Sequence, residues 1–195
     1  MFSVRIHGRG GQGVVTAAEL LSLAAFAEGL EAQAFPSFGS ERMGAPVTAF
    51  CRVDERPIRL REPIAEPDTV VVLDPTLLHH VDVFGGLSDD GYALINSARS
   101  IDQLGLAELL EGRRPERIMT VPASDLARAQ LGRPIPNAAL LGALAALTGL
   151  VSLDSLAQAI GQRFAPATAK GNAAAARDAF SLVSTGGRLA QVPNA

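Results

Sequence analysis

The sequence predicts an α/β protein: a three-layer α/β/α Rossmann-like domain with a mostly parallel or mixed sheet and a helical C-terminal flank. A strand pattern at the N-terminus runs into a glycine turn and an apolar helix, over residues 2–27. The run Thr69–Leu73 is apolar and β-branched, which is typical of a strand covered on both faces. From about residue 124 onward the pattern is helical. We therefore expect one domain over 1–185 and a flexible tail over 186–195.

The N-terminal elements alternate between strand and helix. Phe2, Val4 and Ile6 alternate with polar residues, as in a strand, which the glycine-rich segment 7–13 is expected to break. An apolar helix should follow over Val14–Ala27, with Glu28-Gly29 ending it. Further strands are expected over 31–35, 47–53 and, after a hairpin-like turn, 58–60.

The remaining elements follow in the same way. The Asp74-Pro75 pair should cap a short helix from Thr76, and Ser152 should cap a later helix. Asn137 is expected to cap an Ala/Leu-rich helix through Thr148. The other predicted elements are strands at 69–73, 92–95 and 117–121 and helices at 101–110, 153–164 and 167–184.

Composition excludes several classes of function. The 195 residues are 48% hydrophobic, too apolar for intrinsic disorder, and no apolar run reaches the roughly 18 residues of a membrane span. One Cys and three His are too few for a four-cysteine iron–sulfur site or a zinc finger in this chain. A net charge of −3 offers no basic field to nucleic acid or an anionic membrane. The N-terminus lacks a signal-peptide pattern, so we expect a cytoplasmic protein.

The glycine turn is the first candidate site. Glycines with the spacing G-x-G-x-x-G follow a strand and open a helix, so backbone N–H groups can approach a phosphate. The acidic residue that a dinucleotide fold places after its second strand is missing, because that strand ends in Phe35-Pro36-Ser37. This disfavours NAD or FAD and leaves two interpretations: phosphate contact from another ligand or a partner's cofactor, or tight strand–helix packing alone. The candidate cofactor-binding residues are Gly8, Arg9, Gly10, Gly11, Gln12 and Gly13.

A second loop, over residues 35–47, is the other candidate. It carries two phenylalanines, a charge pair and two glycines at the end of a strand, which suits a binding or docking surface. A loop that only closes over the glycine turn is the alternative. The candidate substrate or partner residues are Phe38, Gly39, Glu41, Arg42 and Gly44.

Other reactive side chains have ordinary interpretations. Cys51 lies in a predicted strand and is expected to be a buried hydrophobe, and His7 is weighed between a structural role and a phosphate contact. Asn96 is left open between a turn and a site residue. Arg59 and Arg61 share a strand face, either solvated or reaching an anion or a partner. We expect no catalytic residue and no metal site in this chain.

Six segments occur in a characteristic order: HGRGGQGVVTAA at 7–18, AQAFPSFG at 32–39, ERMGAPV at 41–47, PIRLR at 57–61, VLDPTLL at 72–78 and GRPIPN at 132–137. Together they resemble the gamma subunit of pyruvate:ferredoxin oxidoreductase, within the 2-oxoacid:acceptor oxidoreductase family, over about residues 4–180. Met43 departs from that family's pattern, where a second Arg is expected.

This resemblance implies a complex that oxidatively decarboxylates a 2-oxoacid, here pyruvate, to an acyl-CoA. Thiamine diphosphate, Mg and iron–sulfur clusters would be held by alpha, beta and delta-type subunits that pass electrons to ferredoxin. The gamma chain would pack beside the active site and help bind coenzyme A. Three alternatives stay open: a stand-alone nucleotide- or CoA-binding regulatory module, a pure assembly protein, or the equivalent subunit of an indolepyruvate or 2-oxoglutarate oxidoreductase.

Overall fold

The computed structural model describes residues 1–37 and 43–186, so nearly all of the predicted tail lies outside it. A six-stranded mixed sheet in the order β2-β3-β1-β4-β5-β6 forms the centre of the fold. β3 runs antiparallel to both of its neighbours, whereas β1, β4, β5 and β6 run parallel to one another. The strands are β1 (Phe2–Arg9), β2 (Glu31–Pro36), β3 (Pro46–Asp54), β4 (Thr69–Val72), β5 (Tyr92–Asn96) and β6 (Ile118–Val121).

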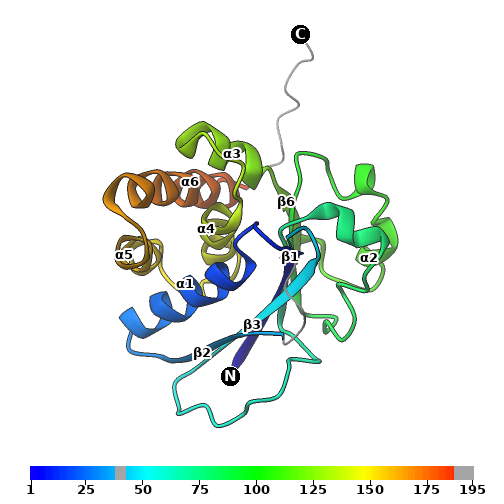
Figure 1. Ribbon diagram of the computed structural model, residues 1–195. Coiled ribbons are helices and arrows are strands. Elements are labelled where there is room, and N and C mark those ends of the chain that lie inside the picture. The colour runs from blue at the N-terminus through cyan, green and yellow to red at the C-terminus, as the bar shows by residue number, and fades with distance from the viewer. Residues whose placement is uncertain (38–42, 187–195) are drawn as a thin grey trace.

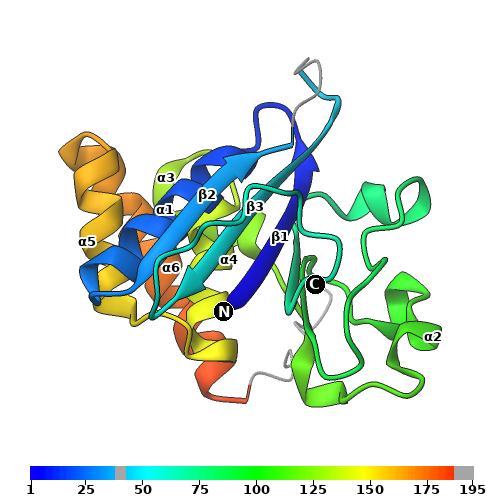
Figure 2. The ribbon, with the colours of Figure 1, turned by 90° about the horizontal axis from the view of Figure 1, so that it is seen from below.

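The two faces of the sheet are covered differently. Long helices gather on one face (Figure 1), and their apolar side chains form the larger core with β1 and β3. The other face carries a smaller core over β4 and β5, covered by α2 (Ala107–Leu110), two short 3₁₀ segments (Pro75–His79 and Asp102–Leu104) and loops (Figure 2). The long helices are α1 (Val14–Ala27), α3 (Ala123–Leu131), α4 (Asn137–Thr148), α5 (Leu153–Arg163) and α6 (Pro166–Ser184). The predicted α/β class and helical flank are confirmed, with a thin third layer.

No helix among the described residues is both long and apolar enough to cross a membrane.

Three predicted elements were wrong in detail. β1 is not broken at His7 but continues to Arg9, because the backbone of Gly8 and Arg9 still pairs with β3. Residues 58–60 form no strand, since β1 and β2 already occupy both edges of β3. The predicted helix at 101–110 is split by Gly105, whose φ of 72° ends the 3₁₀ segment Asp102–Leu104 before α2 begins.

Two of the three predicted caps are confirmed. The side chain of Asp74 accepts a hydrogen bond from the backbone N–H of Thr76, and the Ser152 hydroxyl accepts one from that of Ser155. Asn137 is not a cap but the first residue of α4, because Pro136 occupies the cap position. The fixed φ of proline already suits the start of a helix.

A buried arginine ties loops to the thinly covered face. The Arg5 side chain, on β1, is 9% exposed and donates hydrogen bonds to the carbonyls of Ile64, Ala65, Val83 and Gly85. Burial lowers the pKa of Arg5 from its usual value, although the Asp82 charge opposes this change. An arginine can hold two loops at once because its planar guanidinium carries five N–H donors in a fixed arrangement.

The helical face is closed by an unusually near approach of α4 and α6. A Cβ placed on Gly142 would lie 2.0 Å from the carbonyl oxygen of Ala176, which belongs to the α6 backbone. Only a residue without a side chain fits at this crossing, so glycine is needed here for space.

We expect Gly142→Ala to lower the free energy of unfolding by about 1–3 kcal/mol or more, because the added methyl forces the two helices apart. Gly161→Ala is the matched control: Gly161 lies inside α5, and its Cβ would meet nothing within 4 Å. That variant should be more stable by about 0.5–1 kcal/mol through helix propensity alone. Urea unfolding of both variants measures the difference, and a neutral Gly142→Ala would contradict the packing argument.

Candidate functional site

The glycine turn links the carboxyl end of β1 to the start of α1. Gly10 N–H donates to the carbonyl of Ala45 at 2.9 Å, and Gly44 N–H donates to the carbonyl of Gly10 at 3.2 Å, so the turn is joined to the loop before β3. Gly11 and Gly13 have φ values of 95° and 79°, in the region that favours glycine. A Cβ on Gly8 would lie 2.6 Å from Val14 Cγ2, so this glycine serves close packing.

The turn leaves backbone donors free at the start of α1. Gly13, at the N-cap, offers no capping side chain, and the first turn of α1 carries no acidic residue. The N–H groups of Gly11, Gly13, Val14, Val15 and Thr16 make no hydrogen bond to any other described residue. Together with the helix dipole, these donors give the turn the partial positive charge of an anion site.

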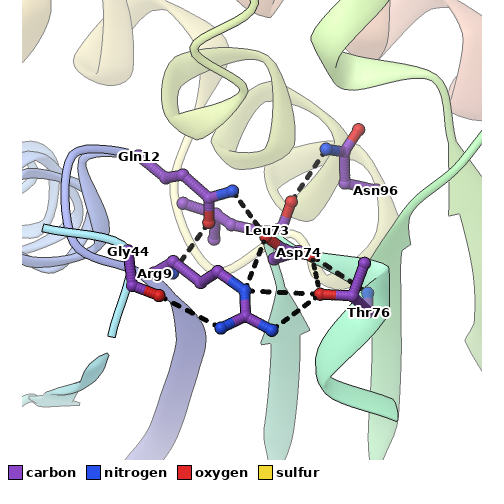
Figure 3. A network of polar contacts seen from close by, with 7 residues as sticks. All are labelled: Arg9, Gln12, Gly44, Leu73, Asp74, Thr76 and Asn96. Carbon is purple, nitrogen blue, oxygen red and sulfur yellow. Dashed lines mark hydrogen bonds and ion pairs between the residues drawn. The ribbon is translucent and has the colours of Figure 1, made fainter. Parts of the chain in front are cut away.

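A network centred on Asp74 fixes the shape of the turn (Figure 3). Gln12 Nε2 donates to Asp74 Oδ2 at 2.8 Å, while Gln12 Oε1 accepts the N–H of Arg9 at 2.7 Å. The other Asp74 oxygen accepts both the N–H and the hydroxyl of Thr76, at 2.9 and 2.6 Å. Burial by itself would raise the pKa of Asp74, but the hydrogen bonds from Thr76 and Gln12 and the charge of Arg9 outweigh it and lower that pKa.

The side chains of Arg9 and Gln12 are used inside this network. Arg9 Nε lies 3.2 Å from Asp74 Oδ2, and the rest of the guanidinium donates to Thr76 Oγ1 and to the carbonyl of Gly44 (Figure 3). Both side chains are candidate ligand contacts. In this structure they bond to Asp74, Thr76 and the backbone around the turn.

Asn96 also has a local role at this edge of the sheet. Its Nδ2 donates to the carbonyl of Leu73 and to Ser124 Oγ, both at 2.8 Å, and its Oδ1 accepts the N–H of Ser124 at 3.0 Å. These bonds tie β5 to the end of β4 and to the start of α3. Asn96 is therefore the last residue of β5 and links three elements, in place of the turn that was one of its two interpretations.

Two hollows lie on either side of the turn and share Gly11, Gly13 and Thr16. We call the first, of about 490 Å³, the helical cavity, because α3, α4 and α6 complete it. We call the second, of about 420 Å³, the turn–loop hollow. The helical cavity is further lined by Gln130, Leu131, Arg133, Ile135, Asn137, Phe164, Ala167, Thr168 and Asn172. The turn–loop hollow is further lined by Arg9, Gly10, Val14, Val15, Met43 and Val47.

The predicted loop residues are only partly visible. Phe38, Gly39, Glu41 and Arg42 lie outside the described residues. Gly44 is described, with a φ of 79° and its carbonyl bonded to Arg9.

Met43, the departure from the family pattern, is 87% exposed in the turn–loop hollow. Its methyl group would lie 3.2 Å from a Cβ placed on Gly11. An uncharged side chain therefore borders the turn where a second arginine was expected.

Sequence reasoning predicted Gly11 and Gly13 but missed the other residues of the helical cavity. Thr16 was predicted only as part of the helix after the turn, Asn137 as a helix cap, and Asn172 as part of the last helix. A signal was present for two of them, because Thr16 lies in HGRGGQGVVTAA and Asn137 ends GRPIPN, both of which matched the family resemblance.

The side chains of the remaining candidates line neither of the two hollows. Cys51 is fully buried, and burial raises the pKa of its thiol to about 12, as expected of a structural cysteine. Arg59 and Arg61 are exposed and lie outside any strand. His7 faces the thinly covered side, where Arg5 Nε donates to its Nε2 at 3.1 Å.

A mixed sheet with a glycine turn at the carboxyl edge of β1 defines a Rossmann-like α/β domain. The model of the pyruvate ferredoxin/flavodoxin oxidoreductase family matches residues 3–182. The chain therefore belongs to that family, and the resemblance to its gamma subunits is confirmed.

Named relatives support the same assignment. The common gamma subunit of the pyruvate/ketoisovalerate oxidoreductases of Pyrococcus abyssi is 52% identical over 180 residues, covering 92% of this chain and 96% of that protein. The pyruvate oxidoreductase subunit PORC of Thermotoga maritima has a similar structure, with a TM-score of 0.78, 36% identity and coverage of 92% and 95%.

A larger enzyme contains the same fold. The 2-oxoglutarate:ferredoxin oxidoreductase of Magnetococcus marinus matches with a TM-score of 0.70 and 17% identity, over 95% of this chain and 31% of that one.

We expect the stability of the protein to fall below neutral pH because of His7. Burial, the nearby Arg5 charge and, in opposition, Asp82 set the pKa of His7 at about 4, against 6.5 for an ordinary histidine. Above pH 6.5 the ring is neutral in both states and the full stability is present. Between pH 6.5 and 4 the unfolded chain takes up a proton that the folded chain refuses, which lowers the free energy of unfolding by up to about 3 kcal/mol.

Urea unfolding from pH 7.5 to 4.5 measures this slope. The control is His7→Gln, whose amide does not titrate and should remove most of the slope. Equal slopes in the two proteins would show that other groups cause the loss of stability.

Proposed function

We propose that this chain is the gamma subunit of a 2-oxoacid:ferredoxin oxidoreductase acting on pyruvate, and that it packs at the active site and helps bind coenzyme A. The observation that carries the proposal is the glycine turn, where free backbone donors face two hollows that no carboxylate lines among the described residues. The pyrophosphate and phosphate groups of coenzyme A suit such donors. The Magnetococcus marinus enzyme, which shares the fold, has coenzyme A bound in its structure.

The substrate assignment follows from the named relatives. Their names specify pyruvate and ketoisovalerate in Pyrococcus abyssi and pyruvate in Thermotoga maritima. The reaction converts the 2-oxoacid, coenzyme A and an oxidised acceptor into an acyl-CoA, carbon dioxide and a reduced acceptor.

We assign the redox and decarboxylation chemistry to partner chains of alpha, beta and delta type. Thiamine diphosphate with Mg would supply carbanion stabilisation there, and iron–sulfur clusters would carry electrons to ferredoxin. The single cysteine of this chain is buried in β3, where it is unsuited to holding a cluster.

The work of this chain is positioning. The Asp74 network holds the turn so that its N–H groups need no rearrangement when an anion arrives. Preorganised donors of this kind contribute through orientation and electrostatics, without transferring a proton.

We expect Gly13→Ala, in the assembled complex, to raise the KM for coenzyme A by roughly ten-fold or more while kcat at saturating coenzyme A changes less. The added Cβ would lie 2.5 Å from Asn137 Nδ2 and disturb the donors at the start of α1. Gly29→Ala is the matched control, because Gly29 has a similar φ of 78° at the other end of α1 and no neighbour within 4 Å of its Cβ. A raised KM in both variants, or in neither, would contradict a role of the turn in binding coenzyme A.

The isolated chain should not reduce a viologen dye with pyruvate and coenzyme A, whereas the co-purified complex should. Activity of the chain alone would refute the assignment of the chemistry to partner subunits.

A further inference from the structure

β2 forms one edge of the sheet and leaves its outer backbone groups unpaired (Figure 2). The N–H of Ser37 donates to the carbonyl of Thr48 at 2.8 Å, and bonds between antiparallel strands recur at every second residue, so the odd-numbered residues of β2 bond to β3. The N–H and carbonyl groups of Ala32 and Ala34 therefore point away from the sheet. They make no hydrogen bond to any other described residue.

β2 itself lacks the features that usually keep an edge strand from pairing. Its pairing with β3 runs without a bulge from Glu31 to Pro36. The charged residue of the strand lies at its start and the proline at its end. The two residues whose backbone faces outward are alanines, which pack against the core beneath α1. An approaching strand would therefore meet no bulky side chain at the free groups.

The free groups are complementary to those of a second copy of the same strand. In an antiparallel pair of β2 strands, Ala32 of one copy faces Ala34 of the other, and each such pair exchanges two hydrogen bonds. Gln33 then lies on the two-fold axis, opposite Gln33 of the second copy. Its Oε1 accepts Arg52 Nη1 at 3.5 Å, which leaves Nε2 without a partner among the described residues. Across the axis, the two side-chain amides can donate to each other.

Opposite charges meet in the same register. Glu31 of one copy faces Phe35 of the other, and the Arg52 guanidinium lies 5.2 Å from the centroid of the Phe35 ring. Neither Glu31 nor Arg52 makes an ion pair with any described residue. The exposed carboxylate of one copy would thus lie beside an unpaired cation of the other.

The helical side of this edge is also open. A hollow of about 310 Å³ beside the strand is lined by Glu19, Ser22, Leu23, Ala34 and Arg163. Phe26 follows one turn further along the same side of α1 and is 51% exposed. Since α1 packs over β2 and β3, pairing would place the α1 helices of two copies about two strand spacings apart, roughly 10 Å, which is a usual packing distance. A second copy would therefore cover Phe26 together with the strand edge.

We propose that this chain self-associates through β2 into a two-fold dimer, in which the two six-stranded sheets join into one. The occupant of the edge is a second copy because the free backbone groups, the Gln33 amide and the Glu31 and Arg52 charges all find their complement in the same strand pair. The inference goes beyond the proposed function and does not depend on it, since none of these residues lines either hollow at the glycine turn.

Disulfide trapping in the full-length chain tests the register. Gln33→Cys should give a disulfide-linked dimer under mild oxidation, because residues directly opposite each other have Cβ atoms roughly 4.5–5.5 Å apart. Glu31→Cys is the matched control: it lies on the same face and is more exposed, but in the dimer it would be about 13 Å from its copy. We expect Gln33→Cys to cross-link roughly ten-fold faster or more, through the higher effective concentration of its thiols. The native Cys51 is fully buried and should not react.

Sedimentation equilibrium of the wild-type chain should show a reversible dimer. Ala34→Pro removes one outward N–H from each copy while leaving the bonds to β3 intact, and it should weaken the dimer roughly ten-fold or more. Met43→Ala, which removes an exposed apolar side chain in the turn–loop hollow, is the control that should dimerise like the wild type.

Three results would overturn the proposal. They are a wild-type chain that stays monomeric at every concentration, a dimer that Ala34→Pro does not weaken, and Glu31→Cys cross-linking as fast as Gln33→Cys. The comparison of the two cysteine variants decides the matter even where Ala34→Pro does not fold.

Discussion

The carboxylate of Asp74 is the group on which the carboxyl edge of the sheet depends. It follows β4, caps the next 3₁₀ segment through Thr76, and accepts Gln12 from the turn after β1. Its ion pair with Arg9 reaches toward the loop before β3, because the same guanidinium donates to Gly44. The two carboxylate oxygens of Asp74 thus connect segments that are far apart in the sequence. A partly buried carboxylate with this many donors is stable in its charged form, which agrees with its lowered pKa.

This arrangement changes how the glycine turn is understood. A polar side chain in a glycine motif is easily taken as a ligand contact, yet Arg9 and Gln12 serve Asp74. The groups left facing outward are backbone N–H donors, whose directions are set by the turn. Gly13 adds a second constraint, because the space above it belongs to the Asn137 amide. The glycine therefore joins the start of α1 to the start of α4.

Elements that depend on local sequence patterns could be predicted from the sequence alone. Alternation and β-branched runs predicted the main strands, and the bounds of α1 agree with its apolar stretch between Gly13 and Glu28. The family itself followed from short motifs in order. Prediction failed where distant packing decides. Residues 58–60 cannot pair with β3, whose two edges are taken by β1 and β2, and Asn172 lines the same cavity as Gly13 only because α4 and α6 cross closely. No local pattern in the alanine-rich α6 indicates that Asn172 is the residue whose amide lines the cavity.

The electrostatics of the chain are consistent with a site that works at short range. With 20 acidic and 17 basic residues, the molecule as a whole does not attract an anionic ligand from a distance. Attraction must come from donors within hydrogen-bond reach, and those are concentrated where α1 begins and Arg133 stands nearby. Such donors are effective because the surrounding helices exclude much of the water and the acidic side chains lie elsewhere. In the function that we propose, these short-range donors orient the anionic co-substrate toward chemistry in the partner chains.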